Sequence, residues 1–326
     1  MSVTLFKHQI EALSNMKNGC ILVGGVGSGK SITSIAYYYL QEGGELSSLT
    51  GGNYIPMGDP PRDLYIITTA QKRDTLEWEG ELSHFLLSTH EEVNIYSNKV
   101  VIDSWNNIGK YKEVKDAFFI FDEQRVCGSG AWVKSFLKIT KVNDWILLSA
   151  TPGDCWMDFV PVFIANGFYK NKTEFIREHV VYSRFTKFPM VERYLNTGRL
   201  LRLRNQILIN MDFNRKTTPH HEDVYLDYNM IIYKDIIKNR WDIWKNEPIA
   251  NASSLCYSLR KVVNSDPTRA DAVLDIFREH PRVIIFYNFD YELEILRKLH
   301  YGKNVEIGEW NGHKHQPVPN SNSWVY

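Results

Sequence analysis

The sequence contains few cysteines, and they are far apart. Four of its 326 residues are cysteine and none forms a C-x-x-C pair: Cys20, Cys127, Cys155 and Cys256. Disulfide-stapled small domains and cysteine-ligated zinc sites both need grouped cysteines, so the sequence indicates neither. Unpaired thiols are typical of a reducing compartment, and we therefore expect the protein to be cytoplasmic.

The sequence also lacks an excess of either charge and any long apolar run. Lysine plus arginine and aspartate plus glutamate each number 38, so any contact with nucleic acid must come from local patches. No run approaches the roughly 18 apolar residues of a membrane span, and the N-terminus has no basic-then-apolar leader. We therefore expect no membrane partner.

The most specific motif present is a glycine-rich loop. It follows the pattern G-x-x-x-x-G-K-[ST] through Gly24, Gly25, Val26, Gly27, Ser28, Gly29, Lys30 and Ser31. An apolar run at 20–23 precedes it and a helical pattern over 31–40 follows. Glycines let backbone N–H groups close on a phosphate, and the helix N-terminus adds positive potential. We predict nucleotide binding, with Lys30 on the phosphates and Ser31 on Mg²⁺. A flexible turn before a helix is the alternative.

A pair of acids follows a later apolar strand. Residues 118–121 are all apolar and lead directly into Asp122 and Glu123. Downstream of a phosphate-binding loop, the first carboxylate can orient Mg²⁺ and the second can polarise the water that attacks the terminal phosphate. The alternative interpretation is a strand end capped by two solvent-facing acids.

Two weaker features lie on either side of these motifs. A strand over 145–148 is followed by Ser149, Ala150 and Thr151, whose hydroxyls can link the acid-bearing strand to a neighbouring domain. Upstream, the side-chain amide of Gln9 offers a donor and an acceptor, which suits the edge of adenine. Alone, these features also fit a plain turn and a surface residue.

The chain is long enough for two domains, or for one domain and part of a second, and its apolar fraction of 44% suffices for ordinary cores. Apolar strands at 20–23, 64–68, 118–121 and 145–148 alternate with helical stretches, which predicts an α/β fold with a parallel sheet. We expect three parts: an ATP-binding domain over 1–155, a mostly helical segment over 156–265, and the beginning of another α/β unit over 266–326.

Taken in order, these motifs resemble those of superfamily 2 helicases of the DEAD/DEAH-like kind. Gln9, residues 24–31, Asp122 with Glu123, and residues 149–151 are similar to the family's glutamine motif and motifs I, II and III. Trp78 with Glu81, and residues 101–105, resemble segments of the chromatin-remodeller-like branch, and 282–288 resemble motif IV. The overall character is that of helicases encoded by bacteriophages.

The resemblance implies a RecA-like P-loop domain, a helical middle segment and an incomplete second RecA-like domain. It implies ATP and Mg²⁺ as cofactors and DNA, duplex or single-stranded, as partner. Lys30, Asp122 and Glu123 would be catalytic, and Ser149 and Thr151 would couple the nucleotide site to DNA. A phage-encoded chain would act in the host cytoplasm.

Two departures from the family pattern stand out. Motif II continues as Gln124 and Arg125 rather than Ala-Asp or Ala-His. The chain also stops before motifs V and VI, so we expect a second polypeptide to supply them or turnover by this chain alone to be slow. The sequence therefore leaves three functions open: a DNA helicase or translocase, a catalytically incomplete ATP- and nucleic-acid-binding module, and the motor subunit of a restriction or recombination assembly.

Overall fold

The structure is a computed structural model, and it describes residues 4–46, 54–58, 60–123, 126–185, 188–213 and 218–326. The chain divides into two compact units, Met1–Thr217 and Thr218–Tyr326. Each unit is described by itself. This division does not test the boundaries expected at 155 and 265, which stay a prediction.

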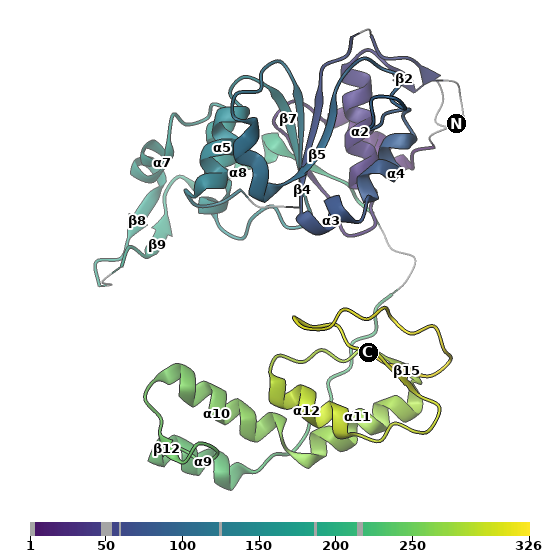
Figure 1. The fold of residues 1–326 in the computed structure, drawn as a ribbon. Coiled ribbons are helices and arrows are strands. Elements are labelled where there is room, and N and C mark those ends of the chain that lie inside the picture. Colours follow the sequence, from purple (N-terminus) through teal and green to yellow (C-terminus); the bar gives the residue numbers. More distant parts are fainter. Residues whose placement is uncertain (1–3, 47–53, 59, 124–125, 186–187, 214–217) are drawn as a thin grey trace. The chain divides into compact units, whose positions relative to one another are not determined.

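A six-stranded sheet in the order β10-β1-β7-β6-β4-β5 forms the centre of the first unit (Figure 1). Every neighbouring pair in it is parallel. The strands are β1 Ile21–Val23, β4 Leu64–Thr68, β5 Val100–Ser104, β6 Phe118–Asp122, β7 Asp144–Ser149 and β10 Leu208–Asn210. The four strands predicted from apolar runs are confirmed. Two edge strands were not predicted, and one of them, β10, comes from the segment expected to be mostly helical.

Alternating side chains bury both faces of this sheet. Along β6, Phe118 and Ile120 belong to one hydrophobic cluster, and Phe119 and Phe121 belong to another. Successive residues of a strand point to opposite faces, so a strand buried on both sides reads as a continuous apolar run. The first cluster draws on α1 Lys7–Asn15, α2 Lys30–Gln41 and α4 Glu77–Ser83. The second draws on η1 Trp105–Tyr111, α5 Ala131–Ile139, α6 Val160–Ala165 and α8 Thr197–Ile207.

The remaining elements of the first unit are short. They are α3 Ala70–Asp74, η2 Trp156–Phe159, α7 Lys172–His179, and two antiparallel pairs, β2 Glu45–Leu46 with β3 Tyr54–Ile55 and β8 Val180–Tyr182 with β9 Val191–Tyr194. Within the described part of the chain, no helix has the length and apolar character needed to cross a membrane.

The second unit combines helices with a small parallel sheet in the order β13-β15-β14. Its elements are α9 Met230–Asn239, β11 Trp241–Asp242, β12 Glu247–Pro248, α10 Ala252–Asn264, α11 Pro267–Glu279, β13 Arg282–Val283, α12 Asp290–Lys298, β14 Glu306–Ile307 and β15 Trp324–Val325. The strand β13 opens the segment that resembles motif IV, and it is only two residues long.

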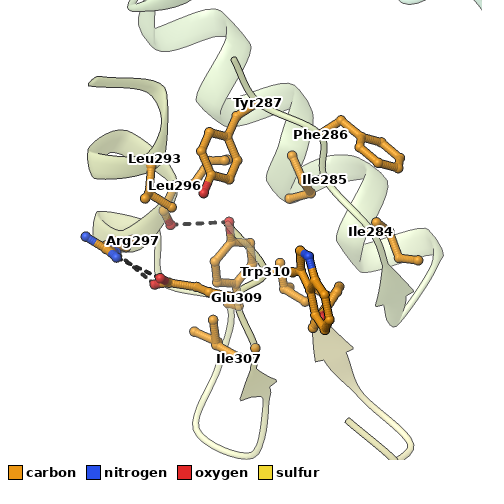
Figure 2. Close-up of a pocket in the computed structure, with 14 residues that line it drawn as sticks. Ile284, Ile285, Phe286, Tyr287, Leu293, Leu296, Arg297, Ile307, Glu309 and Trp310 are labelled. Atoms are coloured by element: carbon orange, nitrogen blue, oxygen red, sulfur yellow. Dashed lines mark hydrogen bonds and ion pairs between the residues drawn. The ribbon is translucent and has the colours of Figure 1, made fainter. Parts of the chain in front are cut away.

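An apolar pocket of about 300 Å³ lies in the second unit, between α12 and the segments that contain β13 and β14 (Figure 2). Glu309 is at its rim, where its carboxylate accepts two hydrogen bonds of 2.7 Å from Arg297 and pairs with Lys314 at 3.3 Å. The hydrogen bonds from Arg297, with Lys314 beside them, lower the pKa of Glu309 to about 2 against the opposing effect of burial.

This cluster predicts a pH-dependent contribution to stability. The folded-state pKa of Glu309 lies below its ordinary value, so the contribution is complete above about pH 4.5 and is lost as the pH falls toward 2. Glu309→Gln should therefore lower the free energy of unfolding by about 1 kcal/mol at pH 7, allowing for screening by solvent, and by less at pH 3. Urea denaturation at both pH values measures this difference. The exposed neighbour variant Glu306→Gln is the control, and an equal loss at both pH values in Glu309→Gln would contradict the prediction.

Candidate functional site

The predicted loop and the predicted acids meet at the carboxyl edge of the first unit's sheet. Strand β7 lies between β1, which leads into the loop, and β6, which ends in the acids. The N–H of Gly24 donates to the carbonyl of Ser149 at 3.3 Å, and the N–H of Glu123 donates to the carbonyl of Leu148 at 3.2 Å. Loop and acids therefore flank the same strand end, two strand spacings or roughly 10 Å apart.

The glycine loop has the backbone that an anion site needs. Gly27 and Gly29 have φ angles of +79° and +81°, a backbone conformation that residues other than glycine rarely adopt. Added Cβ atoms at Gly25 and Gly27 would meet nothing within 4 Å, so the loop is open there. Gly29 is the N-cap of α2, so the first N–H groups of that helix adjoin the loop. Free N–H groups and the positive end of a helix favour a bound phosphate.

Lys30 lies over this loop and is only 8% exposed. Its ammonium donates to the carbonyls of Gly24 and Gly25 at 2.7 and 2.9 Å. Burial lowers the pKa of Lys30, and the carboxylates of Glu123 and Asp122 oppose that shift. The lysine of the loop thus interacts electrostatically with the acids across β7. Ser31 follows it in the first turn of α2 and is half-buried.

Asp122 is 1% exposed, and described residues on neighbouring elements hold it in place. Its Oδ2 accepts hydrogen bonds from Thr68 Oγ1 at 2.9 Å and from Lys72 Nζ at 3.1 Å. The indole of Trp105 donates to its backbone carbonyl at 2.9 Å. Burial raises the pKa of Asp122, and the charge of Lys72 and the bond from Thr68 only partly oppose the rise. A buried carboxylate of this kind needs a cation to stay ionised.

Glu123 differs from its neighbour in exposure and backbone. Its side chain is 43% exposed, and Oε1 accepts a hydrogen bond of 2.9 Å from the same Lys72 ammonium. Its φ angle is +62°, in the left-handed region that a non-glycine residue adopts at a cost of about 1 kcal/mol or more. Such backbone conformations cluster at functional sites, and here the turn presents the carboxylate at the sheet edge.

Lys72 belongs to no motif of the sequence, yet it contacts both acids. It lies on α3, which directly follows β4, and β4 pairs with β6. The pKa of Lys72 is raised because Asp122 and Glu123 together outweigh the opposite effect of burial. The sequence shows this lysine just beyond the end of a predicted strand, but not that this strand pairs with the acid-bearing strand.

Gln9 contacts the loop from the side of α1. Its Oε1 accepts from the N–H of Phe6 at 2.7 Å, and its Nε2 makes a long contact of 3.5 Å with the carbonyl of Ser28. A Cβ at Gly29 would lie 2.1 Å from Nε2, so a larger residue there would displace the Gln9 amide from its contact with the loop. In this arrangement Gln9 fixes α1 to the loop, and its contact with adenine stays a prediction.

The residues of the third motif lie beside the loop. Ser149 is buried, and its Oγ accepts a hydrogen bond of 3.1 Å from the N–H of Thr151, which is exposed. Their coupling role stays a prediction. Gln124 and Arg125 lie outside the described residues. Trp105, at the end of the segment 101–105 that resembles one in the chromatin-remodeller-like branch, is 2% exposed, and its indole donates to the carbonyl of Asp122.

The residues present fit a magnesium-bound nucleoside triphosphate. Asp122 and Glu123 both pair with the Lys72 ammonium, which shows that the two carboxylates can share one cation. A metal ion bound to the triphosphate would place its positive charge at the same carboxylates. The hydroxyl of Ser28 is buried in the loop without a hydrogen-bond partner among the described residues. Those residues contain no group of three or more His, Cys, Asp or Glu able to hold a metal, but Mg²⁺ at a triphosphate needs only one or two side chains.

Comparison with known proteins gives a likeness of fold. No family model and no curated protein matches the chain. The SWI2/SNF2 ATPase core of Sulfolobus solfataricus, solved in complex with double-stranded DNA, is similar over 100% of this chain and 78% of that chain, at 15% identity and a TM-score of 0.51. A second structure of that core domain gives 14% identity, 100% and 76% coverage and a TM-score of 0.46. The Hef helicase domain of Pyrococcus furiosus is similar over 49% of this chain and 36% of that chain, at 18% identity and a TM-score of 0.36.

Of these likenesses, the first alone reaches a TM-score of 0.5, and at 15% identity it bears on the fold alone. Together with the six parallel strands, it shows that the predicted fold class is correct. The chain has an α/β fold with a six-stranded parallel sheet, similar in fold to that SWI2/SNF2 ATPase core.

Proposed function

We propose that this chain is the motor of an ATP-dependent DNA translocase or helicase. The observation that carries the proposal is the placement of the glycine loop and the acid pair on either side of the end of β7. Such an edge is where ligands bind in open α/β sheets. The likeness to a SWI2/SNF2 ATPase core supports the same interpretation.

Each residue of the site has a role in this proposal. Lys30, released from the carbonyls of Gly24 and Gly25, binds the outer phosphates, and the loop N–H groups bind the inner ones. Ser31 and Asp122 hold Mg²⁺, which when bound neutralises charge on the phosphates. Glu123, the more exposed acid, accepts the proton of the attacking water at its carboxylate. Gln9 contacts the adenine.

The proposal names DNA as partner. The core structure with a TM-score of 0.51 was solved with double-stranded DNA, which supports DNA as the polymer that this chain contacts. Ser149 and Thr151 couple the nucleotide site to it, and phosphate contacts would make the grip tolerant of sequence. We further propose that the protein acts in the cytoplasm, that of the host if a phage encodes it.

Lys30→Ala should weaken ATP binding by at least about 100-fold, because a charge-assisted contact with the phosphates is lost. Isothermal titration calorimetry with ATP and Mg²⁺ measures the affinity, and circular dichroism confirms that the variant is folded. The exposed lysine variant Lys17→Ala is the matched control. Unchanged ATP affinity in Lys30→Ala would reject the assignment of the loop.

Glu123→Gln should keep ATP affinity within about threefold of wild type and reduce DNA-stimulated phosphate release by about 100-fold or more, because the proton acceptor is removed. Glu91→Gln, on an exposed surface, is the control. Full turnover in Glu123→Gln would contradict the role of this acid. A wild-type chain that binds ATP and DNA without turnover would instead favour the catalytically incomplete binding module.

A further inference from the structure

A single lysine bridges the two acids of the proposed site. The ammonium of Lys72 is 3.1 Å from Asp122 Oδ2 and 2.9 Å from Glu123 Oε1, and the lysine side chain is 24% exposed. Lys30 is also near, but its ammonium bonds the loop carbonyls. Among the residues that the structure describes, Lys72 is therefore the group that directly compensates the acid pair.

The fold fixes the position of this ammonium. Strands β4 and β6 pair in parallel with Ile67 opposite Phe121, so Thr68 and Asp122 end the two strands side by side. The chain turns directly into α3, where Oγ1 of the N-cap Thr69 accepts a hydrogen bond of 3.2 Å from the N–H of Lys72. The lysine backbone is thus tied at the start of the helix, within side-chain reach of the acids.

This arrangement creates a competition between two cations. Asp122 is almost fully buried, and a buried carboxylate without a positive partner is strongly unfavourable. Lys72 meets that need through Oδ2, the oxygen to which Thr68 also donates. A divalent cation at the same acids would meet the same need and would repel the ammonium at this distance. The Lys72 ammonium and a divalent cation therefore weaken each other's binding to the two carboxylates.

We propose that Lys72 is a positioning residue that holds Asp122 and Glu123 in the nucleotide-free chain and yields this place to Mg²⁺. The inference rests on the proposed function, because that function supplies the metal. In the absence of nucleotide, the Lys72 ammonium occupies the position between the two carboxylates and makes the empty acid pair a poor metal site. Metal binding then becomes favourable chiefly when phosphates supply the remaining oxygen ligands.

Titration of the nucleotide-free chain with Mg²⁺ tests this competition. Isothermal titration calorimetry at constant ionic strength should show that Lys72→Met binds Mg²⁺ at least about tenfold more tightly than wild type, because a neighbouring positive charge is removed. Lys72→Arg, which keeps the charge, should bind like wild type. Arg73→Met is the matched control, since the guanidinium of Arg73 bonds Asp74 and Asp103 instead.

Equal or weaker Mg²⁺ binding by Lys72→Met would overturn the proposal. If this variant is unfolded without metal, Mg²⁺ should restore its thermal transition in circular dichroism, while monovalent salt at the same ionic strength should not. Failure of that rescue would likewise overturn the proposal, because a merely structural lysine has no reason to be replaced by a divalent cation.

The outcome is separable from that of the proposed function, because no nucleotide is present in the titration. Tighter Mg²⁺ binding in Lys72→Met together with no ATP binding by wild type would reject the motor function alone. Normal ATP binding and turnover with no gain of Mg²⁺ affinity would reject the role of Lys72 alone.

Discussion

The parallel pairing of β7 with β1 on one side and β6 on the other is the constraint on which the site depends. The register sets Val23 opposite Ser149 and Asp122 opposite Leu148, so the ends of β1 and β6 lie within one residue of each other along β7. Each of these ends is then tied to β7 by a backbone hydrogen bond from Gly24 or Glu123. A slip of one residue in either pair would reverse the faces of the strand and separate loop from acids.

The core of the sheet supports this register with bulky side chains on both faces. Phe121, directly before the acids, packs edge-on against Phe136 and Trp145, with ring centroids 5.0 and 6.3 Å away. Trp105 reaches from the neighbouring η1 to the carbonyl of Asp122. The two acids therefore lie at the end of a well-packed strand, and Glu123 itself has a left-handed backbone conformation. Rigid support beneath a strained residue is typical of a site that has to present one side chain in one place.

The site combines charges of both signs in a partly buried place. Lys30 and Lys72 face Asp122 and Glu123, and burial acts against the charged forms of Lys30 and Asp122. Lys30 donates to a loop carbonyl where the proposed ligand would offer phosphate oxygens. Lys72 pairs with a carboxylate that would otherwise be available to a metal. A triphosphate with its metal would exchange these internal contacts for external ones, so binding and rearrangement of the lysines are linked.

The sequence was sufficient for the parts of the site that depend on local backbone chemistry. The glycines of the loop need their φ angles, and an apolar run buried on both faces is readable as a strand, so the loop, β6 and Asp122 were predicted at their positions. Strands β5 and β10 were not, because their apolar runs, 100–102 and 207–209, are only three residues long.

Lys72 could not be identified, because its role depends on β4 lying next to β6, and pairing order is not written in any one segment. The sequence predicts that the Gln9 amide contacts adenine. In the structure this amide bonds the N–H of Phe6 and contacts the carbonyl of Ser28 in the loop.

The central claim is that loop and acids form one site for a triphosphate and its metal. The most direct test compares ATP affinity with and without Mg²⁺ in wild type and in Asp122→Asn. Wild type should bind ATP at least about tenfold more tightly with Mg²⁺, and Asp122→Asn should lose this gain while still binding metal-free ATP through the loop. A full Mg²⁺ gain in Asp122→Asn, or none in wild type, would contradict the account.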